Sequence, residues 1–395
     1  MKKKLKAVAN HLLDLGKRNR LLNYKDTGLR SLSVLSDSYE KIFTNILDKK
    51  TYSIFMLDAV LNKFHNDLIL DKDNDNVLDY SLNKVYDIAN KLTKPNELLC
   101  YQKGYSLNNV LRNLYREYRF SIVEKGIDCL YICFGFIEYS ENSQNYLAPL
   151  ILIPIELIFD KGIYKIKAYD DDAIVNPTLK YFLKGEYNYT LLELEDDNLK
   201  NYLSSVEKSL PKKLKFKDGC AIGIFSFLKM NMYNDLMANT DIVLENKNIC
   251  SILQQSPILN DETKEDDIYP VVNCDSSQLN AIKMASSGKS FVLQGPPGSG
   301  KSQTITNIIA TLIANGKHVL FVSEKLAALK VVYENLRRVW LNEFAIELHS
   351  NKANKKDFID SLYKTALLPK YDIKNEANDI IDKHYALKIR LKEYY

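Results

Sequence analysis

Apolar positions in the first part of the chain recur at intervals of three and four, which is the spacing of one helix face. The pattern is carried by Leu12, Leu13, Leu15, Leu21 and Leu22, by Ile42 and Ile46, and by the apolar residues of 52–61. It predicts a mostly helical segment over residues 1–120. The acidic stretch Asp71–Asp79 lacks the glycine and the terminal glutamate of a calcium-binding loop, so we interpret it as a solvated turn.

Residues 121–258 have a different pattern, in which short apolar runs are bounded by polar turns. Strands are predicted at Cys129–Tyr139, Tyr146–Phe159, Gly162–Tyr169 and Ala221–Phe227, and helices at Asn176–Leu183, Thr190–Leu210 and Lys229–Leu236. This mixture indicates an α+β domain. The three adjacent carboxylates at 170–172 offer metal ligands, but consecutive strand residues point to opposite faces, so a hairpin end in water is the default interpretation.

A polar, acidic stretch within residues 259–269 predicts a linker, and the pattern beyond it alternates between strand and helix. In residues 270–395, strands are predicted at Ser290–Gln294, His318–Ser323 and Phe344–Leu348, and helices at Lys301–Ala314, Lys325–Val339 and Ala353–Leu367. Such alternation is typical of a parallel sheet covered by helices. The tail from Asn375 to Tyr395 is helix-like.

One motif in the last segment carries chemistry. It matches the Walker A, or P-loop, pattern G-x-x-x-x-G-K-[ST] and comprises Gly295, Pro296, Pro297, Gly298, Ser299, Gly300, Lys301 and Ser302. Glycines let successive backbone N–H groups point at a phosphate, and the start of the following helix adds a positive dipole end. Lys301 would reach the β- and γ-phosphates, and the Ser302 hydroxyl would bind Mg²⁺. The motif predicts ATP or another nucleoside triphosphate, with Gln303 beside it; a glycine turn without a ligand is the alternative.

Gln278 is a second candidate, 17 residues ahead of Gly295. A glutamine amide pairs with adenine N6 and N7 in a bidentate way, so this residue is a candidate adenine reader. The alternative is an ordinary neighbour of a helix cap, because Asp275 and Ser276 are both good N-cap residues.

Composition narrows the class of protein. The sequence has 395 residues, 46% of them apolar and 26% charged, which is typical of folded domains. The net charge of +4 does not by itself indicate nucleic-acid binding, although the first 30 residues carry nine Lys and Arg against two Asp. That basic stretch fits either a phosphate-binding surface or a solvated helix. The six cysteines form no C-x-x-C pair, and no apolar run approaches the ~20 residues of a membrane helix, so we expect a cytoplasmic protein with no membrane contact.

The sequence also resembles a known family. DSSQLNAI, FVLQGPPGSGKSQTITNII and HVLFVSEKLAAL look like the Q motif, motif I and motif Ia of superfamily-one helicases in the branch related to nonsense-decay and RNA/DNA-processing helicases. The remainder resembles an uncharacterised N-terminal domain of large bacterial proteins described as helicases. The resemblance implies a RecA-like motor in which Gln278 reads adenine, Lys301 and Ser302 are catalytic, and nucleic acid lies along Ser323, Lys325, Asn351 and Lys352. A plain helix cap at 323–325 and a polar loop at 349–352 are the alternative interpretations.

The sequence departs from that family after the P-loop. Only 93 residues follow Ser302, and none of them forms the Asp-Glu pair that binds Mg²⁺ and polarises the attacking water. We therefore expect a partial RecA-like parallel sheet behind a helical and α+β N-terminal domain. Three hypotheses stay open: the ATP-binding front part of a translocase on nucleic acid (single-stranded DNA ahead of RNA), completed by a protein partner or downstream chain; a non-hydrolysing ATP-binding regulatory module; and a truncated remnant of a helicase gene.

Overall fold

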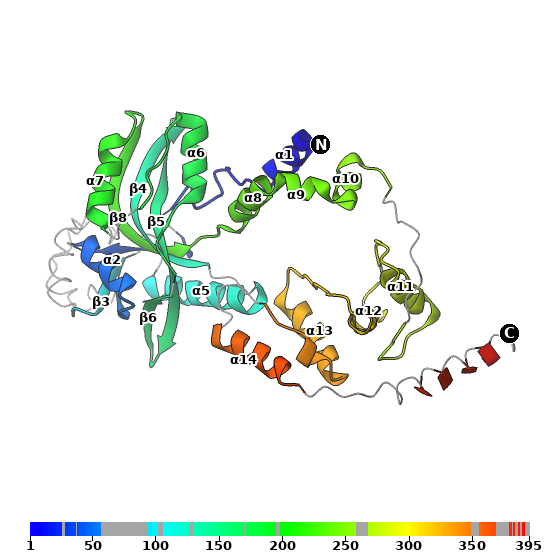
Figure 1. Cartoon of the computed structure of the whole chain (residues 1–395). Coiled ribbons are helices and arrows are strands. Elements are labelled where there is room, and N and C mark those ends of the chain that lie inside the picture. The colour runs from blue at the N-terminus through cyan, green and yellow to red at the C-terminus, as the bar shows by residue number, and fades with distance from the viewer. Residues whose placement is uncertain are drawn as a thin grey trace. The chain divides into compact units, whose positions relative to one another are not determined.

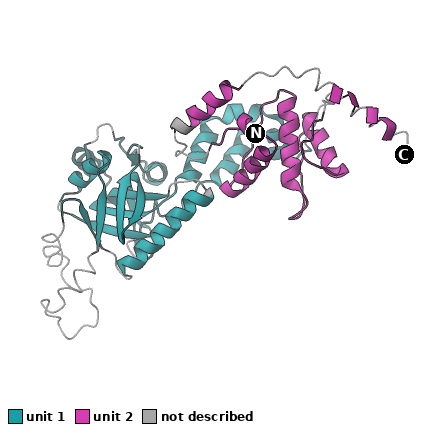
Figure 2. Ribbon diagram, turned by 90° about the horizontal axis from the view of Figure 1, so that it is seen from below, with its two compact units in different colours: residues 1–262 teal, residues 263–395 magenta. Residues whose placement is uncertain are grey.

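The chain forms two compact units, residues 1–262 and residues 263–395, in a computed structural model (Figure 2). The structure describes residues 1–25, 28–36, 38–56, 94–101, 106–125, 129–141, 143–169, 171–194, 198–257, 268–348 and 355–368, together with short stretches between 379 and 391. No described helix combines the length and the apolar character that crossing a bilayer requires.

Unit 1 is built on a mixed sheet that closes on itself. Its strands are β1 Ser31–Leu35, β2 Tyr52–Met56, β3 Glu97–Tyr101, β4 Leu130–Glu141, β5 Gln144–Asp160, β6 Ile163–Ala168, β7 Ile174–Val175 and β8 Leu214–Ile224. They pair in the order β4-β8-β1-β3-β2-β6-β5-β7, and β4 also pairs with β5, so seven strands form a ring and β7 extends it at β5. The β2–β3 pairing is parallel and the other pairings are antiparallel.

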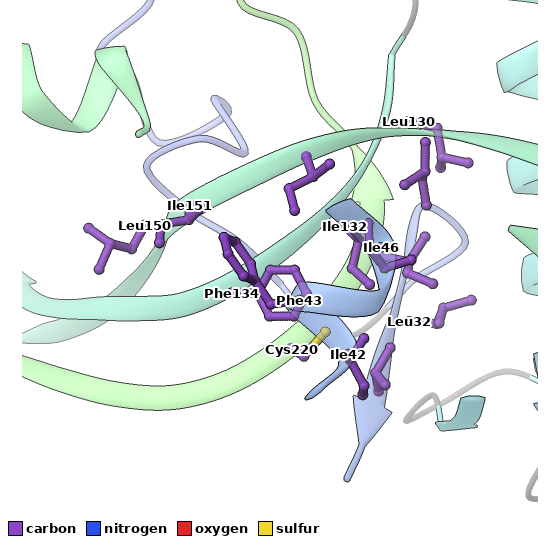
Figure 3. Packing of buried hydrophobic residues seen from close by; sticks show 14 of the residues in the cluster. Leu32, Ile42, Phe43, Ile46, Leu130, Ile132, Phe134, Leu150, Ile151 and Cys220 are labelled. Atoms are coloured by element: carbon purple, nitrogen blue, oxygen red, sulfur yellow. The ribbon is translucent and has the colours of Figure 1, made fainter. Parts of the chain in front are cut away.

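The strand β4 is buried on both faces, which explains its continuous apolar sequence. Leu130, Ile132 and Phe134 face the larger core, where the ring of Phe134 meets Phe43 of α2 edge-on with centroids 5.3 Å apart (Figure 3). The alternate side chains, Tyr131 and Cys133, face a second, smaller core. Alternation along a strand places one core on each side of the sheet.

Helices pack against the long strands β4, β5 and β8 and cover the larger core (Figure 1). The helices of unit 1 are α1 Lys2–Asn10, α2 Tyr39–Leu47, α5 Leu107–Phe120, α6 Pro177–Tyr187, α7 Leu199–Ser209, α8 Leu228–Ala238, α9 Thr240–Glu245 and α10 Lys247–Gln254, with a π-helical turn η1 Ser121–Lys125 after α5. Side chains of α2, α5, α6 and α7 enter this core. The strands predicted at 129–139, 146–159 and 162–169 are confirmed, as are the helices predicted at 176–183 and 229–236.

The prediction of a mostly helical segment over residues 1–120 is wrong at several places. β1, β2 and β3 lie in it, and the helical spacing assigned to 52–61 begins with the strand β2. The leucines between 12 and 22 lie in turns rather than in a helix. β1 pairs with β8 and β2 pairs with β6, while β3 lies between β1 and β2, so both segments contribute to one sheet. Five-residue strands are too short for periodicity to separate them from helix turns. The stretch 71–79, which we interpreted as a solvated turn, lies outside the described residues.

Unit 2 consists of helices joined by extended segments in the part that the structure describes. The helices are α11 Ser276–Ser286, α12 Lys301–Ala314, α13 Leu326–Arg338, α14 Lys355–Ala366 and a 3₁₀ turn η2 Asn342–Phe344. The predicted helices at 301–314, 325–339 and 353–367 are confirmed, the first of them at both ends. The linker predicted at 259–269 lies almost wholly outside the described residues, and the tail at 375–395 is described only in short pieces.

The predicted parallel sheet of unit 2 is not confirmed. None of the segments 290–294, 318–323 and 344–348 forms a strand among the described residues. Their apolar side chains are exposed instead: Val292 is 90% exposed, Leu320 82% and Leu348 67%. An extended segment becomes a strand only when its N–H and C=O groups pair with a neighbour, and these segments have the sequence of strands without that pairing.

Candidate nucleotide-binding site

The loop from Gly295 to Ser302, hereafter the 295–302 loop, curls so that it leads directly into α12. Gly298 and Gly300 have φ values of 84° and 77°, in the left-handed region that glycine adopts without a steric penalty. Gly300 is also the N-cap of α12, and the first hydrogen bond of the helix runs from Thr304 N–H to its carbonyl at 2.9 Å. The N–H groups that open α12 at 301–303 therefore have no acceptor within the helix, which makes the helix start suited to an anion.

Side chains of the 295–302 loop hold this curl. The Ser299 hydroxyl donates to Pro296 O at 2.9 Å. The Lys301 ammonium donates to the same carbonyl at 2.7 Å and also to Gly295 O. The Lys301 side chain thus folds back over the loop and holds its positive charge near the N-terminus of α12. A Cβ at Gly295 would meet the Ser299 side chain, so the curl itself requires glycine there.

Gln278 lies against the 295–302 loop although 21 residues separate it from Ser299. Its Nε2 donates to Ser299 O at 3.3 Å, and its Oε1 accepts from Asp275 N–H at 3.1 Å. The Asp275 carboxylate in turn accepts from Gln278 N–H at 2.8 Å, which completes a capping box at the start of α11. The structure therefore brings Gln278 together with the loop, and it also shows the cap role that the sequence left as the alternative.

Hydrogen bonds from Ser277 and from the backbone of Gln278 hold the pKa of Asp275 below its usual value. The carboxylate is exposed, so this shift reports the capping geometry and not burial. Its negative charge lies at the N-terminus of α11, where the helix dipole favours it.

Buried polar side chains on α12 place the segment that precedes α11. Asn307 is fully buried; its Oδ1 accepts from Val271 N–H at 2.8 Å and Val272 N–H at 2.9 Å, and its Nδ2 donates to Val272 O at 2.9 Å. One turn further, the Thr311 hydroxyl accepts from Tyr269 N–H at 3.2 Å. Sequence reasoning missed both residues. The two side chains are four positions apart, which places them on one face of α12, but other polar residues on the same helix hide this spacing in the sequence.

The predicted nucleic-acid residues are placed only in part. Ser323 is the last residue of the segment 318–323, and its hydroxyl accepts from Lys325 N–H at 3.3 Å; the N-cap of α13 is Lys325, and no side chain caps this helix. Lys325 is exposed at the start of α13. Asn351 and Lys352 lie outside the described residues.

In the part of the chain that the structure describes, no three His, Cys, Asp or Glu side chains form a cluster that could hold a metal ion. Asp171 and Asp172 precede β7 without such a partner set, and Asp170 lies outside the described residues. All six cysteines are described and are free thiols.

Comparison with known families assigns a region to each unit. Residues 11–183 match the family described as "Protein of unknown function (DUF4011)", and residues 273–357 match the family described as "AAA domain". The second match contains the whole 295–302 loop together with Gln278. No solved structure matches the chain.

Two curated relatives are described as uncharacterised ATP-dependent helicases. The protein from Mycoplasma genitalium is 26% identical over 307 residues, which cover 67% of this chain and 27% of the relative. The protein from Mycoplasma pneumoniae is 26% identical over 262 residues, covering 57% of this chain and 24% of the relative. The matched part thus spans about a quarter of each relative. The chain joins a DUF4011 region to an AAA region and is homologous to an uncharacterised ATP-dependent helicase.

Proposed function

We propose that unit 2 binds ATP through the 295–302 loop and Gln278, and that the protein acts as a helicase-type translocase on nucleic acid. The observation that carries this proposal is the joint geometry of the loop, the start of α12 and Gln278. Homology to an ATP-dependent helicase supports the same nucleotide. Hydrolysis and strand movement are proposed for a protein that also supplies an Asp-Glu pair, which does not follow Ser302 in this sequence.

The phosphates are assigned to residues 295–303. The unpaired N–H groups at the start of α12 and the left-handed glycines suit phosphate oxygens. The ammonium of Lys301 is held by two loop carbonyls, which are weaker partners than a phosphate, so the same group can turn to a ligand. Ser302 would hold Mg²⁺, which neutralises phosphate charge when it is bound.

Adenine is assigned to Gln278. Each of its amide atoms makes one hydrogen bond, to Asp275 and to Ser299. The amide oxygen has a second lone pair and the nitrogen a second hydrogen, so Gln278 can pair with a base and keep the capping box. This arrangement would link the base to the phosphate loop through one side chain.

Nucleic acid is assigned to Ser323 and Lys325, with Asn351 and Lys352 completing the surface, and single-stranded DNA is preferred to RNA. The support is the resemblance to motif Ia together with the exposed position of Lys325 before α13. A lysine there can neutralise one phosphate of the backbone.

The test is binding of a fluorescent ATP analogue to the whole chain. Lys301→Ala should weaken binding at least about tenfold, because it removes a charge-assisted contact of roughly 1.5–3 kcal/mol. Lys289→Ala is the matched control, since it removes one exposed lysine from unit 2 outside the 295–302 loop. Equal affinity of the two variants would contradict the assignment.

A non-hydrolysing ATP-binding module is the second candidate, because the geometry of the 295–302 loop and Gln278 supports nucleotide binding without requiring hydrolysis. The two proposals differ in turnover. Phosphate release by a longer form of the protein, stimulated by single-stranded DNA and abolished by Lys301→Ala, supports the motor. Tight ATP binding without any release supports the module.

A further inference from the structure

Unit 1 contains a half-buried arginine, Arg20, in which two of the three guanidinium nitrogens lack a hydrogen-bond partner in the part of the chain that the structure describes. The side chain of Arg20 lies over the ring of Phe225, with the guanidinium carbon 5.9 Å from the ring centroid. Its Nε and one terminal nitrogen are inaccessible to solvent, and neither has a hydrogen-bond partner among the described residues. Burial lowers the pKa of Arg20, yet a guanidinium stays charged at neutral pH. A cation with buried, unpaired nitrogens is costly to a fold, so a protein retains one where an anion completes it.

Arg20 lines one of two adjoining hollows on unit 1. The first has a volume of about 350 Å³ and the second about 540 Å³, and the two share the walls formed by Ile224, Phe225, Ser226 and Leu228. We call the pair the Arg20 groove. A groove of this combined size accommodates a phosphodiester and an adjacent base rather than a single small ion.

The charge of the Arg20 groove is strongly positive. Its walls carry five cationic side chains against two carboxylates, namely Arg18, Arg20, Arg30, Arg116 and Lys229 against Asp14 and Glu117. Asp14 pairs with Lys229 at 3.9 Å and Glu117 with Arg30 at 3.1 Å. Three of the arginines therefore lack a carboxylate partner among the described residues, which gives a field that attracts an anion.

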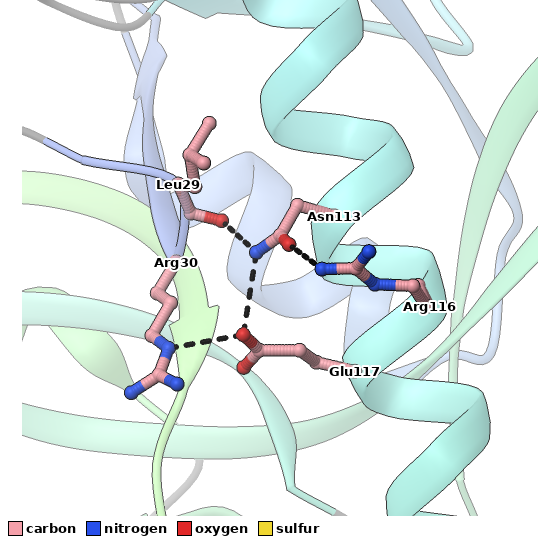
Figure 4. Close-up of polar contacts among 5 residues, drawn as sticks. All are labelled: Leu29, Arg30, Asn113, Arg116 and Glu117. Carbon is pink, nitrogen blue, oxygen red and sulfur yellow. Dashed lines mark hydrogen bonds and ion pairs between the residues drawn. The ribbon is translucent and has the colours of Figure 1, made fainter.

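Hydrogen bonds of Asn113 and an ion pair of Glu117 hold the side chains around the second hollow (Figure 4). Asn113 on α5 donates to Leu29 O at 2.8 Å and accepts from Arg116 at 2.8 Å, while Glu117 accepts from Arg30. The cations are thus ordered without being fully neutralised. Phe120, at the end of the same helix, lines this hollow and is 60% exposed. An exposed aromatic ring beside ordered cations is the arrangement on which single-stranded bases stack.

We propose that the Arg20 groove binds the backbone of single-stranded nucleic acid, with a phosphate at Arg20 and a base on Phe120. The site lies in unit 1, partly within the residues that match DUF4011 and partly beyond them at 224–230, and it is independent of the ATP site proposed for unit 2. The phosphate chemistry also fits inorganic phosphate. The exposed Phe120 favours nucleic acid, because a free phosphate makes no use of an aromatic surface.

The experiment uses the whole chain with Lys301→Ala, Lys325→Ala and Lys352→Ala, so that the 295–302 loop and the nucleic-acid surface proposed for unit 2 both lose their lysines. Fluorescein-labelled oligothymidylate is titrated against this protein and against the same protein carrying Arg20→Met, Phe120→Ser or Lys200→Met. Arg20→Met should weaken binding about 10- to 100-fold, the loss expected for a charge-assisted contact. Phe120→Ser should weaken it about fivefold or more. Lys200→Met removes an exposed charge of α7 outside the groove and should change affinity less than about twofold.

The thermal unfolding midpoint distinguishes a ligand-binding role of Arg20 from a purely structural one. Because Arg20→Met removes a half-buried charge with unpaired nitrogens, the midpoint should stay unchanged or rise by roughly 2–4 °C while oligonucleotide binding falls. The slope of log affinity against log salt should fall by about one. A lowered midpoint with unchanged binding in both Arg20→Met and Phe120→Ser would overturn the proposal. So would Arg20-dependent binding of inorganic phosphate without binding of the oligonucleotide. ATP-analogue binding by Arg20→Met with Lys301 intact shows whether unit 2 is affected.

Discussion

Gly300 of the 295–302 loop lies directly against the side chain of Gln278. Replacing Gly300 with alanine tests whether this close approach matters. Two penalties arise at once. At φ 77° any residue with a Cβ is strained, at about 1–2 kcal/mol. The new Cβ would also lie against Nε2 of Gln278, closer than real Cβ contacts, and 3.1 Å from Oε1 of Gln303. Displacing Gln278 removes its bonds to Asp275 and Ser299, together worth roughly 1–2 kcal/mol.

Gly316→Ala is the matched control for this variant. Gly316 follows the other end of α12 at φ 68°, and an added Cβ there would meet nothing within 4 Å. It therefore carries the backbone strain without the contact. We expect Gly300→Ala to destabilise unit 2 by about 1–2 kcal/mol more than Gly316→Ala. Hydrogen exchange of the Gln278 amide measures this, because that N–H is bonded to Asp275 in the capping box.

Binding of the ATP analogue is the second measurement. If Gln278 and the 295–302 loop act as one site, Gly300→Ala should weaken binding about tenfold relative to Gly316→Ala. Equal exchange rates and equal affinities in the two variants would refute the reasoning that the close approach of Gln278 matters.

Three other predictions concern unit 2. Asn307→Ala removes a buried amide that makes three hydrogen bonds to the backbone of Val271 and Val272, so it should cost about 2–4 kcal/mol in urea unfolding; a loss below ~1 kcal/mol would contradict the role given to this residue. Ser277→Ala should raise the pKa of Asp275, measured by NMR titration of the carboxyl carbon, and an unchanged pKa would exclude the hydrogen bond. Since a depressed pKa stabilises the fold above the usual carboxyl pKa, that contribution disappears as pH falls through the lowered value. Residues 270–395 alone should bind a hydrophobic dye and unfold without cooperativity, because strand-like segments there are exposed; a sharp, high-temperature transition of a monomer would be contrary evidence.

The sequence was informative where structure depends on neighbouring residues. The helix at 301–314 follows from a glycine before it and a run of helix formers after it, and its ends are as predicted. The long hairpin of β4 and β5 follows from two apolar runs around a polar turn. Both signals are local, so periodicity and turn chemistry are enough to read them.

The failures have a common physical cause, which is pairing between distant segments. β1 pairs with β8 across about 190 residues of chain, and nothing in five residues such as 31–35 specifies that partner. In unit 2 the error was of the opposite kind. Strands were predicted at 290–294 and 318–323 from their apolar sequences, but strand formation also needs a neighbouring strand, which composition and periodicity do not supply. Gln278 was a candidate because of its position ahead of the P-loop and because of the family resemblance, whereas Asn307 was overlooked because it is one of several polar residues on α12.

The closed ring of unit 1 also shows that a family boundary need not coincide with a folding boundary. The DUF4011 match ends at residue 183, whereas β8 runs from 214 to 224 and is hydrogen-bonded to both β4 and β1. A protein cut at 183 would open the ring and expose two unpaired strand edges, which are templates for aggregation. The stretch that an expressed fragment must keep for the ring to close therefore extends at least 40 residues beyond the C-terminal end of the family match.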